Sequence, residues 1–132
     1  MTTLKQKSVF LMLFLLAAFT TVNAQLEANE TVLQSFAPSE LAEMDSNEIA
    51  WLNFLATESY VVSYNPEKSG DLPDLTERDP LLLQSGVNPF RAGITPQNEN
   101  QYFRIGNTGK VVVFYAESRV ETLWERKQIN PK

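Results

Sequence analysis

The chain of 132 residues carries 16 acidic and 11 basic side chains, so its formal charge is -5 at pH 7, and it has neither cysteine nor histidine. Without these two residue types, a Ser-His-Asp or Cys-His catalytic arrangement, a thiol redox centre and the usual zinc site are all excluded. The acidic balance opposes binding to nucleic acid and to anionic lipid head groups, because both require Lys and Arg to neutralise phosphates.

The first 24 residues have the pattern of a Sec signal peptide. Lys5 and Lys7 precede an apolar run over 9–19 that is shorter than the roughly 20 residues a membrane-spanning helix needs. Val22 and Ala24 are small residues at the positions that signal peptidase reads, so we expect cleavage after Ala24 and a periplasmic or extracellular protein. An uncleaved anchor is the alternative. No later segment is long and apolar enough to be expected to span a membrane.

Cleavage would change the charge and the length of the chain. The segment holds two lysines and no acid, so its removal takes the formal charge from -5 to -7, and 132 residues less 24 leaves 108. A chain of this length can bury one core without cross-links, and the absence of cysteine requires that it do so.

Residues 25–37 are polar with isolated apolar side chains, and we expect a partly disordered lead-in in which Phe36 docks onto the domain. A short helix over 28–34 is the alternative. The triplet Asn29-Glu30-Thr31 fits the N-glycosylation sequon, which has meaning only in a eukaryotic secretory route.

The first predicted helix covers about 45–57. Asp45 and Glu48 have the spacing of a capping box, and apolar residues then recur at helical spacing, with Trp51 and Phe54 widening the apolar face. We interpret these aromatic residues as core, and a partner-binding groove is the functional alternative. Residues 59–64 then change to β-favouring side chains and predict a strand.

Residues 65–100, which we name the strap, contain five of the seven prolines and three of the five glycines. Such punctuation defeats both helices and central strands, and it predicts a long irregular excursion. Apolar residues within the strap predict that it packs in order over the sheet: Leu81, Leu82, Leu83, Val87, Phe90 and Ile94.

A hairpin is predicted over 102–116. The run 111–116 is almost entirely β-branched or aromatic, and Gly106, Asn107 and Gly109 before it tolerate the positive φ of a tight reversal, so 102–105 should pair with it. The Asn107-Thr108-Gly109-Lys110 segment lacks the glycine spacing of a phosphate-binding loop, and its position favours a hairpin turn.

The last predicted element is a helix over about 119–128, with Ser118 and Glu121 at capping-box spacing. The whole chain therefore predicts an α+β fold in one domain, 38–132: a small, mostly antiparallel sheet with the two helices packed on it and the strap beside them. The residues expected to be most buried are Phe54, Leu55, Val112, Phe114, Leu123 and Trp124.

The strap contains an acidic loop whose oxygens are of the kind that a hard cation such as Ca²⁺ binds. The loop lacks the alternating ligands, central glycine and closing glutamate of an EF-hand, and acidic loops are usually only solvated. We therefore assign no metal and no cofactor, and we retain these acids as weak metal candidates: Asp71, Asp74, Glu77 and Asp79.

Two functions stay open. The first is a non-enzymatic exported module that binds a protein or another cell-envelope component through a sheet edge or the strap. The reason is that a small sheet leaves open edges. A homo-oligomer or an assembly subunit would differ from this module only in the identity of the partner. Its predicted binding residues lie in the strap and at its border: Phe90, Arg91, Tyr102 and Arg104.

The second function is a carboxylate-based, glycan-directed hydrolase with strap acids in the cleft wall. It requires two carboxyl groups about 5 to 10 Å apart, one of them with a raised pKa. The acids that qualify by position are Glu58, Glu67, Asp71, Asp74, Glu77 and Glu99.

Overall fold

The computed structural model of the protein describes residues 27–129, so the expected signal peptide and its cleavage site lie outside the described residues. The described residues divide into two compact units, 27–53 and 54–129, and the division falls inside helix α4 (Ser46–Glu58). The domain expected over 38–132 spans this division. Within the described ranges, no helix combines the length and the apolar character that a membrane crossing requires.

The first unit consists of short helices held by asparagine side chains. Asn29 caps α2 (Glu30–Ser35), since its Oδ1 accepts from the Val32 amide at 3.0 Å. The Asn29 amide in turn donates to Oδ1 of Asn53 in α4 at 2.8 Å. Helix α3 (Pro38–Ala42) begins with proline at a first-turn position, where the missing amide donor costs nothing. The region expected to be a partly disordered lead-in therefore contains the short helix that was its alternative.

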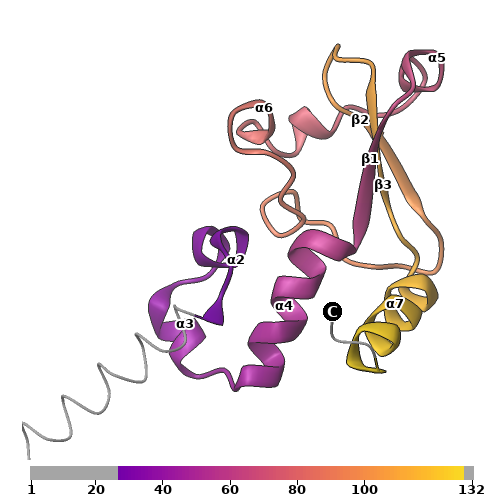
Figure 1. Ribbon diagram of the computed structural model, residues 1–132. Helices are drawn as coiled ribbons and strands as arrows, with labels where there is room; N and C mark the ends of the chain where they lie inside the picture. Colours follow the sequence, from indigo (N-terminus) through magenta and orange to yellow (C-terminus); the bar gives the residue numbers. More distant parts are fainter. Residues whose placement is uncertain (1–26, 130–132) are drawn as a thin grey trace, which may run out of the picture. The chain divides into compact units, whose positions relative to one another are not determined.

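The second unit contains a three-stranded antiparallel sheet, which confirms the predicted α+β fold (Figure 1). Its strands are β1 (Tyr60–Tyr64), β2 (Gln101–Arg104) and β3 (Lys110–Phe114), all within a residue or two of the predicted positions. Their order is β1-β3-β2, so the predicted hairpin of β2 and β3 gains β1 on the far side of β3. Both edge strands are therefore only four or five residues long.

One face of the sheet is covered by the strap. Phe103, Val112 and Phe114 point to this face, and the Phe114 ring lies 5.9 Å from that of Phe103 and 5.7 Å from that of Tyr60. The strap residues that complete this core are Leu75, Leu82, Ala92 and Ile94. The strap thus supplies the apolar cover that the sequence predicted for it, and without it these rings would lie in water.

The strap is less irregular than expected. It contains α5 (Pro66–Ser69), the 3₁₀ turn η1 (Leu75–Glu77) and α6 (Leu82–Ser85). Of the three consecutive leucines expected as anchors, only Leu82 is buried, whereas Leu81 is 48% and Leu83 is 65% exposed. The reason is geometric, because neighbouring residues of a helical turn point in different directions and only one of them faces the sheet.

The C-terminal helix α7 (Glu117–Ile129) contacts the end of α4 that belongs to the second unit. The rings of Phe54 and Trp124 meet edge to face with centroids 5.2 Å apart. Phe54, Val112 and Phe114 are buried as predicted, while Leu55, Leu123 and Trp124 are only half-buried. In α7 the buried position is Val120, which leaves Leu123 and Trp124 at the margin of the contact. In the part of α4 that belongs to the second unit, the buried positions are Phe54 and Ala56, and Leu55 between them points in another direction.

Candidate functional site

Arg91, a predicted binding residue, forms a buried ion pair inside the strap. Its Nε lies 2.6 Å from Oδ1 of Asp79, whose side chain is 0% exposed, and the Leu81 amide donates to the same oxygen at 3.2 Å. Nη2 of Arg91 donates to the Gly86 carbonyl at 2.9 Å. Oδ2 of Asp79 has no hydrogen-bond partner among the described residues. The guanidinium therefore stabilises the strap, because a buried carboxylate without its cation would be costly.

Phe90 lies in the same turn of the strap. Its amide donates to Oδ1 of Asn88 at 3.0 Å, the Arg91 amide donates to that oxygen at 3.2 Å, and Asn88 is itself buried. The Phe90 ring is half-buried. This pair of predicted residues is thus held in place by a local asparagine turn.

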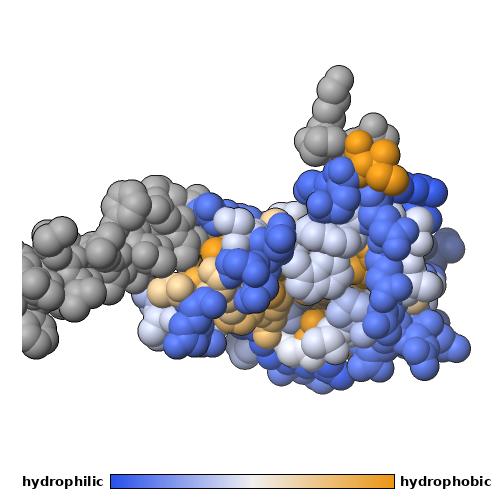
Figure 2. All heavy atoms as spheres, turned by 90° about the horizontal axis from the view of Figure 1, so that it is seen from below, coloured by the Kyte–Doolittle hydropathy of each residue, from blue (hydrophilic) through white to orange (hydrophobic). Residues whose placement is uncertain are grey.

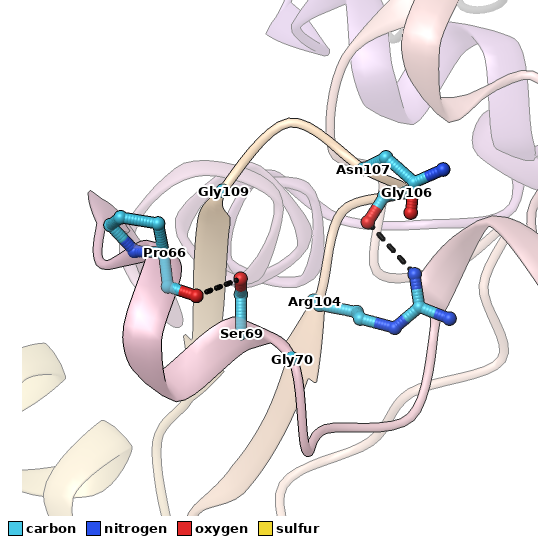
Figure 3. Close-up of a pocket in the computed structure, with 7 residues that line it drawn as sticks. All are labelled: Pro66, Ser69, Gly70, Arg104, Gly106, Asn107 and Gly109. Atoms are coloured by element: carbon cyan, nitrogen blue, oxygen red, sulfur yellow. Dashed lines mark hydrogen bonds between the residues drawn. The ribbon is translucent and has the colours of Figure 1, made fainter.

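Arg104, another predicted binding residue, joins three segments of the second unit. Its Nε donates to the Leu72 carbonyl at 3.0 Å, and its Nη1 donates to the Gly106 carbonyl at 2.8 Å (Figure 3). Nη1 also lies 3.5 Å from Oδ2 of Asp74. Much of the donor capacity of this guanidinium is therefore used within the protein.

Asp74 is an ionised structural carboxylate. Burial raises the pKa of its carboxyl. The hydrogen bonds from Thr76 and from the Gly106 amide, together with the positive charge of Arg104, lower the pKa by more than burial raises it, so it lies below its ordinary value. A glycosidase acid needs a pKa shifted in the opposite direction. Asp74 consequently links η1 to the β2–β3 turn and is unsuited to donate a proton at neutral pH.

A hollow of about 400 Å³ lies between α5 and the β2–β3 turn (Figure 3). Ser69 donates its hydroxyl to the Pro66 carbonyl at 3.0 Å, and Arg104 points its guanidinium toward Gly106, as described above. No carboxylate lines this hollow, so it offers no acid–base pair. Its lining is mostly small residues: Pro66, Ser69, Gly70, Arg104, Gly106, Asn107 and Gly109.

The weak metal candidates are not brought together. Asp71 and Glu77 are exposed, while Asp74 and Asp79 each pair with an arginine. Among residues 27–129, no group of three or more His, Cys, Asp or Glu side chains is placed to hold a metal ion. A second hollow, of about 340 Å³, does carry two acids, Glu117 and Glu121, but both are exposed at the start of α7.

The outer edge of β2 is partly closed by the strap. The Arg104 amide donates to the Pro73 carbonyl at 2.9 Å, and Asp74 forms a parallel bridge with Arg104. Tyr102, the fourth predicted binding residue, is 38% exposed on the side of the sheet away from the core, with Nζ of Lys68 4.3 Å from its ring centroid. The structure thus brings Tyr102 and Arg104 to one face of β2.

Among residues 27–129, no strand pairs with the outer edge of β1. Two backbone bonds flank the strand, from the Tyr115 amide to the Ser59 carbonyl and from the Asn65 amide to the Gly109 carbonyl, each 2.9 Å long. Because bonding alternates along an antiparallel strand, Val61 and Ser63 also bond to β3, whereas the backbone groups of Tyr60, Val62 and Tyr64 point away from it. In the described part of the chain, β3 is the only strand paired with β1.

Four of the five residues of β1 are exposed, and Tyr60 is half-buried. Val61 is 43%, Val62 39% and Tyr64 72% exposed, and these three stand among eight large apolar residues exposed in the described ranges. On the face drawn in Figure 2, hydrophobic residues form small areas among hydrophilic ones. The strand contains no proline and no charge, which are the devices that normally keep an edge from pairing. Val62 and Tyr64 were not predicted as site residues, because the strand order that places them at an edge is not readable from local sequence.

Comparisons of this chain with models of protein families, with curated proteins and with solved structures give no match.

Proposed function

We propose that this chain is a small exported, non-enzymatic module that binds another protein by adding a strand of it to the open edge of β1. The observation that carries the proposal is the set of outward-facing backbone groups at Val62 and Tyr64. Strand addition gives affinity through main-chain hydrogen bonds and specificity through alternating side chains. Export belongs to the same proposal and rests on the pattern of residues 1–24.

The side chains of β1 define what the added strand must contain. Tyr60, Val62 and Tyr64 point to the face of the sheet that carries the core, and Val61 and Ser63 point to the other face. A partner strand therefore gains most from apolar residues on the first face and small or polar ones on the second. Charged residues opposite Val62 would lose hydration without an ionic partner.

The hydrolase alternative has less support. Glu58, Glu67, Asp71, Glu77 and Glu99 are exposed, whereas the acid of a glycosidase works in a pocket that is shielded from water. Asp74 has a lowered pKa. The two glutamates of the smaller hollow remain, but they lie one helical turn apart on an exposed face, where substrate distortion and water exclusion have no structural basis.

Binding through the β1 edge is tested with two substitutions of Val62. Val62→Pro removes the outward amide and leaves the bonds to β3 intact, since proline is tolerated at an edge position whose N–H faces outward. Val62→Thr keeps the amide and the β-branched shape, so it is the matched control. Each protein is used to capture partners from envelope extract, and the captured proteins are identified by mass spectrometry.

The proposal expects a partner that is retained by the parent and by Val62→Thr and lost by Val62→Pro, with unchanged circular dichroism in all three. A partner captured equally by all three proteins would place the interaction elsewhere. Capture of nothing by a protein that is monomeric at every concentration would contradict the binding function itself.

A further inference from the structure

We infer that the strand taken up by the β1 edge is β1 of a second copy of this chain. The inference rests on the proposed function, because it names the partner of the same edge. The exposed strand reads Tyr-Val-Val-Ser-Tyr, which is nearly the same in both directions. A two-fold axis needs a self-complementary patch, and an antiparallel pair of identical strands provides one.

The outward-facing residues determine the register of such a pair. A two-fold axis at Val62 places Val62 opposite Val62 of the second copy and Tyr60 opposite its Tyr64. These are the residues whose backbone groups point away from β3, and in an antiparallel ladder each such pair exchanges two hydrogen bonds. The joined sheet would run without a break through both copies.

Side chains match on both faces in this register. On the core face, tyrosine lies opposite tyrosine and valine opposite valine, and aromatic or β-branched cross-strand pairs stabilise by about 0.2 to 1 kcal/mol each. On the other face, Val61 lies opposite Ser63 of the second copy. A shift by one residue would turn these side chains to the wrong faces. A shift by two would place Tyr64 opposite Glu58, or Tyr60 opposite Pro66, of the second copy, so the register centred on Val62 gives the best match of side chains.

Charge does not oppose the pairing. Residues 54–132 hold ten acidic and nine basic side chains, a net charge of -1, whereas the six acids of 27–53 have no basic residue among them. The acidity of the chain is therefore concentrated outside the unit that carries the sheet.

The area of the contact predicts a reversible dimer. A five-residue strand is about 17 Å long, so two of them bury less than the roughly 1,200 Å² that stable complexes usually need. We expect a monomer–dimer equilibrium that shifts with concentration in the micromolar range or above, measured by sedimentation velocity on the protein expressed from its full sequence.

Charge reversal at the two-fold axis is the first test. Val62→Lys and Val62→Glu each place like charges directly opposite one another, and both variants should weaken the dimer at least about tenfold. A mixture of the two should regain a heterodimer, because the charges then attract. Val62→Thr should dimerise like the parent. Both charged variants keep the backbone amide and lie at an exposed position, so their fold is expected to survive.

Disulfide trapping tests the register. The chain has no cysteine, so Val61→Cys and Ser63→Cys introduce the only thiols. Their opposed positions form a non-hydrogen-bonded pair with Cα atoms about 4.5 Å apart, within the range that a disulfide accepts. Mixing the two variants should give a mixed disulfide in several-fold excess over either homodisulfide, and adding Val62→Pro to both should abolish that excess.

Three results would overturn the inference. These are a dimer that persists in Val62→Lys, a mixture of charged variants that stays monomeric, and equal trapping of mixed and homodisulfides. A fourth result would separate the inference from the proposed function. If the chain stays monomeric at all concentrations and captures a different protein, and if Val62→Pro abolishes this capture, then the partner of β1 is not a second copy and the proposed function still holds.

Discussion

Phe114→Ala tests whether the strap and β3 share one core. The side chain is 2% exposed, and its ring packs between those of Tyr60 and Phe103. Truncation of a phenylalanine buried to this extent to alanine costs about 3 to 5 kcal/mol of stability. Each aromatic contact contributes about 0.5 to 1.5 kcal/mol in addition to the contribution of its buried area. The two contacts place the expected loss near the upper end of the range for a buried phenylalanine, at about 5 kcal/mol. This is a large part of the roughly 5 to 15 kcal/mol by which a typical domain is stable.

The measurement is urea unfolding followed by circular dichroism. Val113→Ala is the matched control, because Val113 is the preceding residue of β3, points to the opposite face and is only half-buried. Its cost should stay below about 2 kcal/mol. If the two variants unfold within about 1 kcal/mol of each other, the face of Phe114 is not the core, and the placement of the strap over it is wrong.

Three further predictions concern the strap and the turn. Gly109→Ala should destabilise the protein by about 1 kcal/mol more than Gly93→Ala in the same assay. Both glycines have a positive φ, but a Cβ at Gly109 would lie 2.8 Å from the Tyr64 ring, whereas a Cβ at Gly93 would meet open space. Equal losses of stability would contradict this contact. Arg91→Ala should lower the free energy of unfolding by about 3 to 5 kcal/mol, because it leaves Asp79 buried without its cation. The control Arg126→Ala, at an exposed position, should lower it by less than about 1 kcal/mol. Similar losses in the two variants would show that the ion pair does not stabilise the protein. The pKa of Asp74 is lowered in the folded protein, so its carboxylate should stabilise the fold at neutral pH and lose this effect as the pH falls below the ordinary pKa of 3.8. The stability lost in Asp74→Asn should therefore be constant between about pH 5 and 7 and become smaller in stronger acid. A loss of stability that does not depend on pH would refute this.

Local signals predicted the strands and the long helices well. The β-branched run of β3 and the glycines of its turn lie next to each other in sequence, so pairing, turn chemistry and burial all favour the same hairpin. Helix α4 begins directly after the predicted cap Asp45, whose Oδ1 accepts from the Glu48 amide at 2.8 Å. Helix α7 begins at Glu117, so the predicted cap Ser118 lies inside the helix and that capping prediction is wrong. These elements depend on interactions a few residues apart, which a sequence displays directly.

The site could not be predicted in the same way. Arg91 and Arg104 were chosen as binding residues, but their guanidinium groups contact Asp79 and the Leu72 and Gly106 carbonyls, partners between 2 and 32 positions away. Whether an arginine faces a ligand or its own backbone depends on tertiary packing. The openness of β1 likewise follows from the order β1-β3-β2, which is set by long-range pairing of residues 60–64 with 110–114.

Amide hydrogen exchange, resolved by residue and measured at several protein concentrations, tests the open edge of β1 most directly. We expect Val61 and Ser63 to exchange slowly at every concentration, because their amides bond to β3. Val62 and Tyr64 should exchange fast in dilute protein and become protected as the concentration rises. Slow exchange of the Val62 and Tyr64 amides in the most dilute sample would contradict an open edge. Fast exchange of the same amides at the highest concentration, with or without a bound partner, would contradict strand addition at this edge.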